Sequence, residues 1–203
     1  MRKILLLAAV ATFGAGAANA MTMVTSVNGP DMGPTGNQHV VDDFSTSAGL
    51  SGTYSLATGS TSGVTAAPLG DTTQYLSVGG GQAATLTLAR PLEALSFYWG
   101  SIDKYNTVSF FSGANKIASF TGGDVPPAPA NGSQGNALNN RRVNFDFGGA
   151  KVSSVQFSSA QNAFELDTVA GSVPEPAAWA LFLVGFGMIG VSVRRRNAMV
   201  VSA

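Results

Sequence analysis

Short stretches in which hydrophobic and polar residues alternate recur through the middle of the chain. A period of two places successive side chains on opposite faces of a strand. Most stretches are rich in β-branched or aromatic residues and bounded by Gly, Asn, Asp or Pro, as is typical of strands joined by turns. They lie at residues 40–44, 74–78, 83–89, 92–99, 107–112, 116–120, 142–147, 152–158 and 163–169. The pattern predicts an all-β domain over residues 21–171, an antiparallel sandwich of jelly-roll type.

The strongest alternation lies at residues 95–99. Period two puts Leu95, Phe97 and Trp99 on one face of the strand, which we expect to be core. The next stretch, at residues 107–111, is expected to pair with it across a turn.

The N-terminus shows a different pattern, an apolar run after a basic start. An Arg-Lys pair precedes residues 4–17, and Ala18 and Ala20 fit the small-x-small cleavage rule. The sequence therefore predicts a signal peptide at residues 1–20, cut by signal peptidase after Ala20. The alternative is an uncleaved anchor.

The C-terminus carries a second apolar run, the uncharged residues 177–193. Its length is at the lower limit for crossing a bilayer as a helix. The run stops at Arg194, Arg195 and Arg196, and clustered arginine favours the cytoplasmic side. Trp179 would lie at the outer interface, which suits an indole ring. We expect a single transmembrane helix; a buried core helix is disfavoured because the run has no polar face.

A proline-rich motif precedes this span. Pro174 and Pro176 fix their own backbone and bias their predecessors toward extended shapes, so the segment is expected to be exposed. The motif at residues 174–180 consists of Pro174, Glu175 and Pro176, with Trp179 and Ala180 after a two-residue gap. Motif, span and basic stop together, at residues 172–203, resemble the PEP-CTERM sorting signal of Gram-negative bacteria. A plain anchor would leave the Pro-Glu-Pro segment unexplained.

The resemblance implies a partner and a route. An exosortase, a membrane-embedded cysteine protease, would recognise the motif and cut near it. The precursor would be anchored in the inner membrane, and the product would reach the periplasm, the cell surface or the extracellular matrix, often with exopolysaccharide or a biofilm. Residues 97–101, 105–106 and 164–167 are also similar to exported sandwich domains that often carry this tail.

The charge of the exported domain argues against nucleic acid as a partner. Five of the 11 basic residues and one of the 11 acidic residues lie in the targeting ends. The domain keeps six basic and ten acidic residues, which gives a net charge of −4, and it has no basic patch. The chain has no cysteine, which excludes thiol nucleophiles and Cys-based zinc sites.

Catalytic residues are scarce. His39 is the only histidine, so a His-rich zinc site and a Cys/His pair are excluded. The remaining catalytic chemistry is a carboxylate pair, as in a glycosidase. Candidates for it are Asp42, Asp43, Asp103, Glu165 and Asp167. We expect a non-enzymatic surface or matrix protein without catalytic residues; the alternative is a small secreted hydrolase acting on polysaccharide.

Two binding sites are conceivable in the domain. Hard oxygen ligands suit calcium, and Glu165 and Asp167 share one strand face, while Asp42 and Asp43 lie near the other end of the domain. The sequence predicts no cofactor other than such a structural calcium ion.

The second conceivable site would bind a sugar. Tyr98, Tyr105 and Asn106 could together form a sugar platform that binds exopolysaccharide. A long loop at residues 122–140 could be a binding loop or a mobile one.

Overall fold

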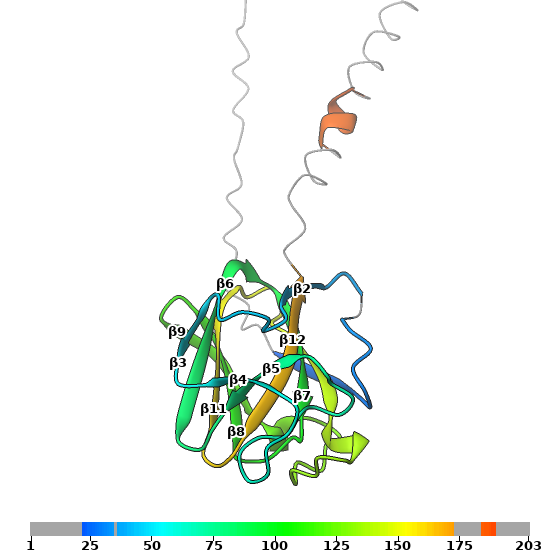
Figure 1. The fold of residues 1–203 in the computed structure, drawn as a ribbon. Coiled ribbons are helices and arrows are strands. Elements are labelled where there is room, and N and C mark those ends of the chain that lie inside the picture. The colour runs from blue at the N-terminus through cyan, green and yellow to red at the C-terminus, as the bar shows by residue number, and fades with distance from the viewer. Residues whose placement is uncertain (1–21, 35, 173–183, 190–203) are drawn as a thin grey trace, which may run out of the picture.

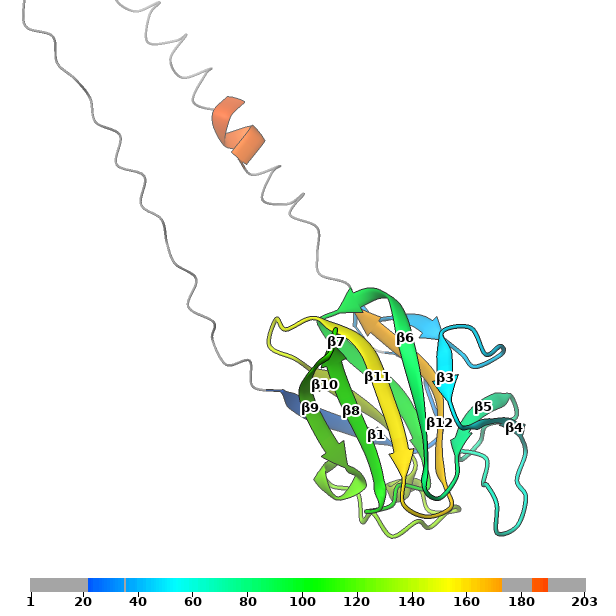
Figure 2. The same cartoon turned by 90° about the vertical axis from the view of Figure 1, so that its left-hand side faces the viewer.

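The computed structural model of the protein describes residues 22–34, 36–172 and 184–189. Two antiparallel sheets face each other, as the alternation predicted (Figure 1). The larger sheet has the order β1 (Met23–Asn28), β10 (Arg141–Asp146), β7 (Ala94–Gly100), β12 (Phe164–Ser172), β5 (Gln74–Val78) and β4 (Ser55–Thr58), and β2 (His39–Asp42) also pairs with β12. The smaller sheet, facing the viewer in Figure 2, has the order β3 (Leu50–Gly52), β6 (Gln82–Leu92), β11 (Val152–Ser159), β8 (Asn106–Ser112) and β9 (Asn115–Thr121).

An aromatic core fills the space between the sheets. Leu95, Phe97 and Trp99 are completely buried, which confirms the core face predicted for this strand. The ring of Phe97 stacks on Phe145 of the same sheet, with ring centroids 5.6 Å apart. It meets Phe157 of the smaller sheet edge-on at 5.3 Å, and such aromatic contacts stabilise beyond the burial of area alone.

The pairing expected for this strand was wrong. β7 pairs with β10 and β12 in the larger sheet, whereas β8 pairs with β11 and β9 in the smaller one. Each strand carries one face of large apolar side chains. These faces bury more surface when they meet across the sandwich than when the strands lie side by side. The segment between them, which includes Ser101 at φ 40°, crosses from one sheet to the other.

The predicted strand at residues 92–99 is two strands in different sheets, because β6 ends at Leu92 and β7 begins at Ala94. Three strands escaped prediction: β1, β3 and β4. β3 and β4 have only three and four residues, and β1 alternates but is largely exposed at the sheet edge. The predicted loop at residues 122–140 contains two short 3-10 turns, η1 (Gly122–Asp124) and η2 (Ala137–Asn139).

The domain begins and ends at one end of the larger sheet. Met23 pairs with Asp146, Asp146 with Ala94, and Ala94 with Ser172, so these four residues form a row across adjacent strands. Three strand spacings place Met23 and Ser172 roughly 14 Å apart. The two predicted targeting segments are therefore attached to the same end of the sandwich.

The targeting segments themselves lie almost entirely outside the described residues. This applies to the predicted signal peptide with its cleavage site at Ala18 and Ala20, and to most of the span at residues 177–193. Residues 184–189 of that span are helical. Within the described part of the chain, no helix has the length and apolarity needed to cross a membrane.

Candidate functional site

The predicted sorting motif follows directly on the last strand. Ser172, the final residue of β12, pairs with Ala94, and its carbonyl accepts a hydrogen bond from the backbone N–H of Glu93 at 3.2 Å. The motif residues lie beyond it, outside the described part of the chain: Pro174, Glu175, Pro176, Trp179, Ala180 and the stop residues Arg194, Arg195 and Arg196. A cut anywhere after Ser172 would leave every strand of the sandwich in place.

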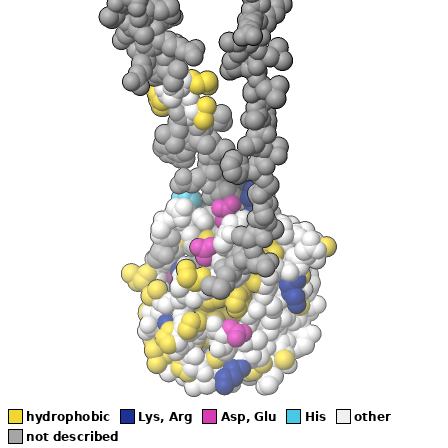
Figure 3. All heavy atoms as spheres, turned by 180° about the vertical axis from the view of Figure 1, so that it is seen from behind, with side chains coloured by type: hydrophobic (Ala, Val, Ile, Leu, Met, Phe, Trp, Pro, Cys, Tyr) yellow, Lys and Arg dark blue, Asp and Glu magenta, His cyan; other side chains and the backbone are white. Residues whose placement is uncertain are grey.

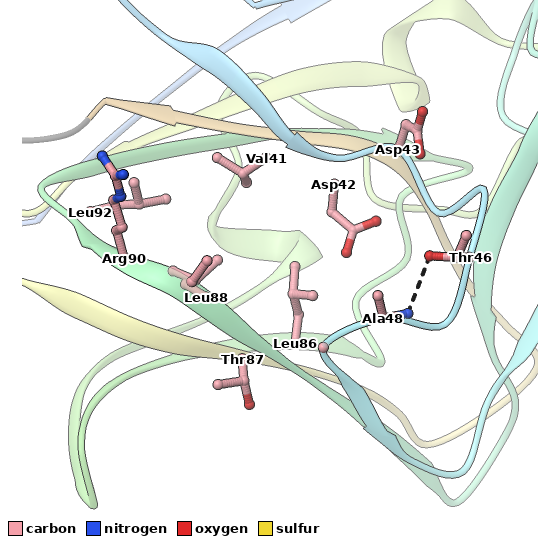
Figure 4. A pocket seen from close by; sticks show the side chains of 12 residues that line it. Val41, Asp42, Asp43, Thr46, Ala48, Leu86, Thr87, Leu88, Arg90 and Leu92 are labelled. Carbon is pink, nitrogen blue, oxygen red and sulfur yellow. Dashed lines mark hydrogen bonds between the residues drawn. The ribbon is translucent and has the colours of Figure 1, made fainter.

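A cavity of about 500 Å³ lies between β2 and β6 (Figure 4). Val41, Leu86 and Leu88 form part of its apolar wall, and Asp42, Asp43, Thr46 and Arg90 supply polar groups. Leu92, which also lines it, lies against Gly171 near the end of β12. The cavity is therefore at the same end of the sandwich as the attachment of the sorting segment.

The four acidic residues considered for calcium do not converge. Asp42 and Asp43 line this cavity, and their carboxylates accept hydrogen bonds from the backbone N–H groups of Phe44 and Ser45. Glu165 and Asp167 share one face of β12, as period two predicted, but they line two separate smaller hollows. Among the described residues, no group of three or more His, Cys, Asp or Glu side chains is placed to hold a metal ion.

The proposed sugar platform does not form as one surface. Tyr98 and Asn106 are buried, so neither can stack on a sugar face; Tyr105 alone is partly exposed. The Tyr98 hydroxyl lies 2.9 Å from the carbonyl oxygens of both Gly29 and Leu69. Asn106 donates to the carbonyl of Ala163 at 3.1 Å. These side chains hold loops on the sheet, a role that sequence alone did not indicate.

Charged side chains are scattered over one face of the domain. Figure 3 shows one face, on which the Lys and Arg side chains lie apart from one another among uncharged groups. His39, the one histidine of the chain, lies in β2, where it pairs with Gly171. The surface in this view offers no basic stripe that could follow a phosphate backbone.

Asn140 is a structural residue that the sequence did not single out. Its side-chain oxygen accepts hydrogen bonds from the backbone N–H groups of Leu69 at 3.0 Å and Ser101 at 3.1 Å. Its amide group donates to the carbonyls of Gln134 and Asn136. Asn is common in loops, so no sequence signal separates this buried residue from its neighbours. It ties three loops together at the end of the sandwich opposite Ser172.

Glu165 is a buried acid at that same end. Only 2% of its surface is exposed. One carboxyl oxygen accepts from the backbone N–H of Ala66 at 2.9 Å, and the other accepts from the hydroxyl of Ser101 at 2.8 Å. Burial raises the pKa of Glu165 to about 7, and these hydrogen bonds oppose the rise only partly. The carboxyl group is therefore protonated in the folded domain under mildly acidic conditions.

A Glu165→Gln variant is expected to lose part of the pH dependence of stability. Between its ordinary pKa of 4.5 and about 7, the folded state holds a proton that the unfolded state has released. The contribution of Glu165 to the free energy of unfolding is greatest below pH 4.5. It falls by up to about 3 kcal/mol as the pH rises through 7. Glutamine stays neutral and can keep both hydrogen bonds, accepting from Ala66 and donating to Ser101.

Urea unfolding of both proteins from pH 5 to pH 8 measures this effect. The variant should match the wild type at pH 5 and exceed it at pH 8. A Glu93→Gln control should keep the wild-type pH dependence, because Glu165 is intact. Equal pH slopes in the wild type and Glu165→Gln would contradict the assignment.

Comparison with known proteins adds one match at the C-terminus. Residues 172–196 match the model of the PEP-CTERM protein-sorting motif. No curated protein matches the chain. A crystal structure of the catalytic unit of a thermostable GH87 α-1,3-glucanase from Streptomyces thermodiastaticus is similar at 16% identity and a TM-score of 0.35, covering 63% of this chain and 26% of that one. The chain is therefore a PEP-CTERM protein, and from that family it follows that it is an exosortase substrate.

Proposed function

We propose that this protein is a non-enzymatic component of the cell surface or extracellular matrix, delivered there as an exosortase-processed precursor. The observation that carries the proposal is the position of Ser172. This residue ends the last strand of the sandwich and begins the segment matched by the sorting motif. The whole folded domain lies upstream of the motif, so removal of the tail would release it intact.

The attachment of both targeting segments to one end of the sheet supports the same route. The row from Met23 to Ser172 would face the inner membrane in the precursor. Signal peptidase would cut after Ala20, and the span at residues 177–193 would then be the remaining tether. Cleavage by exosortase near Glu175 would free the domain toward the periplasm, the surface or the matrix.

Glu175→Ala, or the pair Pro174→Ala and Pro176→Ala, is expected to block tail removal. The altered chain should accumulate in the membrane fraction with its tail intact, while the wild type loses it. Measuring the intact mass of the protein in each cell fraction, from cells with and without the exosortase, shows whether the tail has been removed. Asn197→Ala, beyond the arginine cluster, is the matched control and should be processed normally. Normal processing of Glu175→Ala, or a mature product that still carries Trp179, would contradict the proposal.

We further propose that the exported domain binds exopolysaccharide in the cavity between β2 and β6. An apolar wall with a few polar groups is typical of ligand sites. Val41 and Leu88 offer apolar surface to the C–H face of a sugar, and Asp42, Asp43 and Arg90 offer partners for its hydroxyl groups.

Binding of host exopolysaccharide to Val41→Arg tests this location. The arginine should fill the cavity and reduce binding at least tenfold. Val27→Arg is the matched control, because Val27 is also an exposed strand valine, 63% exposed against 45% for Val41, and lies on β1 away from the cavity. Equal binding by the two variants would place the polymer elsewhere.

Because two adjacent carboxylates line this cavity, a polysaccharide hydrolase is the second candidate function. Asp42 and Asp43 both line it, and burial raises the pKa of Asp42. Asp42→Asn and Asp43→Asn separate the two functions. Binding retained within roughly tenfold, without turnover in any variant, would support the binding protein. Polysaccharide cleavage that one of these changes abolishes would support the hydrolase.

A further inference from the structure

A small polar hollow of about 190 Å³ lies beside Asp167 in β12. The strand is irregular there. Its register with β7 shifts between Asp167 and Ala170, and Thr168 has φ 49°. On its other edge, β5 pairs with residues 164–166 and β2 with residues 169–171, so Asp167 falls between the two. Bulges of this kind often re-aim a side chain at a functional site.

Two carboxylate oxygens at this hollow are buried and have no hydrogen-bond partner among the residues that the structure describes. They are Oδ1 of Asp167 and Oδ2 of Asp71. Asp167 as a whole is 7% exposed, and both residues line the hollow. The hydroxyl of Thr73 lies 2.6 Å from Oδ1 of Asp71 and 3.3 Å from Oδ2 of Asp167. Oδ2 of Asp167 also accepts a hydrogen bond from the hydroxyl of Thr168 at 3.0 Å, and Oδ1 of Asp71 accepts one from the backbone N–H of Thr73 at 2.8 Å. These donors therefore reach only one oxygen of each carboxylate.

The neighbouring cationic side chain, that of Arg142, is already paired with another carboxylate. The guanidinium of Arg142 donates to both oxygens of Asp31, at 2.7 and 2.5 Å, and to the carbonyl of Thr168 at 3.2 Å. This pairing compensates Asp31, which also lines the hollow, but not Asp71 and Asp167. Buried carboxylates without a partner charge are costly, and proteins resolve this by pairing them or binding metal.

We propose that Asp71 and Asp167 bind one calcium ion in this hollow. Calcium prefers hard oxygen ligands and accepts neutral ones beside carboxylates. One such oxygen is the carbonyl of Leu69, a residue that lines the hollow; it shares the single proton of the Tyr98 hydroxyl with the carbonyl of Gly29. Because Asp31 is paired with Arg142, only two carboxylates of the hollow remain for the ion. We therefore expect weak binding, as in extracellular modules whose Kd for calcium is about 10⁻⁴–10⁻³ M. The ion would fix the loop that carries Asp71 to the strand that ends at Ser172.

Thermal unfolding of the full chain in mild detergent tests the site. With 10 mM calcium, the wild-type midpoint should rise by roughly 3–6 °C over the value in chelator. Asp71→Asn and Asp167→Asn should each lose the rise. Asp43→Asn is the matched control, because Asp43 lies in the other cavity, and should keep it. Terbium is a second probe that does not depend on stability: Tyr98 lines the hollow, so excitation of tyrosine should give terbium luminescence that calcium displaces.

Each result decides the proposal. A calcium-dependent rise that disappears in Asp71→Asn and Asp167→Asn but persists in Asp43→Asn would support it. An unchanged midpoint between calcium and chelator would overturn it, even if the asparagine variants were more stable than the wild type. A rise that survives in both asparagine variants, or is lost in Asp43→Asn, would also overturn it.

Discussion

Replacing Phe97 with alanine is expected to lower the free energy of unfolding by about 3–5 kcal/mol. The ring is completely buried at the centre of the sandwich. Four other rings surround it, with centroid distances of 5.3–6.2 Å; they belong to Trp99, Phe145, Phe157 and Phe164. Alanine would lose the transfer free energy of the ring and leave a cavity that strands fixed in two sheets cannot fill. Urea unfolding followed by tryptophan fluorescence measures the loss.

Phe111→Ala is the matched control for this prediction. Phe111 lies near the end of β8 and is only partly buried, in contrast to its neighbour Phe110. Its replacement is expected to cost about 1 kcal/mol, because a partly exposed ring has less surface to lose. Equal losses in the two variants would show that the packing around Phe97 is not the main source of stability in this core.

The alternation at residues 95–99 predicted the core face because period two is a local property. Burial of Leu95, Phe97 and Trp99 requires only that one face of the strand meets apolar surface. The partner strand is a long-range property that this pattern does not contain. β10 and β12 flank β7, although they begin more than 40 residues later in the chain. The sequence therefore indicated the layers of the sandwich but not its strand order.

The polar sites show the same difference between local properties, which the sequence pattern predicts, and long-range ones, which it does not. Period two placed Glu165 and Asp167 on one face of β12, and the structure confirms this. What each carboxylate does depends on the loop that covers it. Ala66 donates to Glu165, whereas Asp71 and Thr73 lie beside Asp167. These residues come from the connection between β4 and β5, which has no strand periodicity and gave no signal in the sequence.

The ion pair between Arg142 and Asp31 holds a loop on the larger sheet. Arg142 lies in β10, and its side chain is 5% exposed; that of Asp31 is 20% exposed. The guanidinium also donates to the hydroxyl of Ser96 at 3.1 Å and to the carbonyl of Thr168. Its charge is thus buried against the middle of the sheet, and within the described part of the chain Asp31 is its ion-pair partner, through two short hydrogen bonds.

Removing Asp31 is therefore expected to cost far more than a surface ion pair. Asp31→Ala should lower the free energy of unfolding by roughly 3 kcal/mol, because it leaves the buried guanidinium without a counter-charge. Exposed pairs contribute 0–1 kcal/mol by comparison. The double variant Asp31→Ala with Arg142→Met should recover most of this loss, since methionine removes the charge and fills similar space.

Urea unfolding of the wild type, both single variants and the double variant measures the coupling. Chelator is present throughout, so that the neighbouring hollow binds no cation. A coupling of at least 2 kcal/mol is expected, and it should persist in 1 M salt because buried charges are poorly screened. If Asp31→Ala cost less than 1 kcal/mol, water would have to reach Arg142 through the loop, and the loop would not be fixed to β10 by this pair.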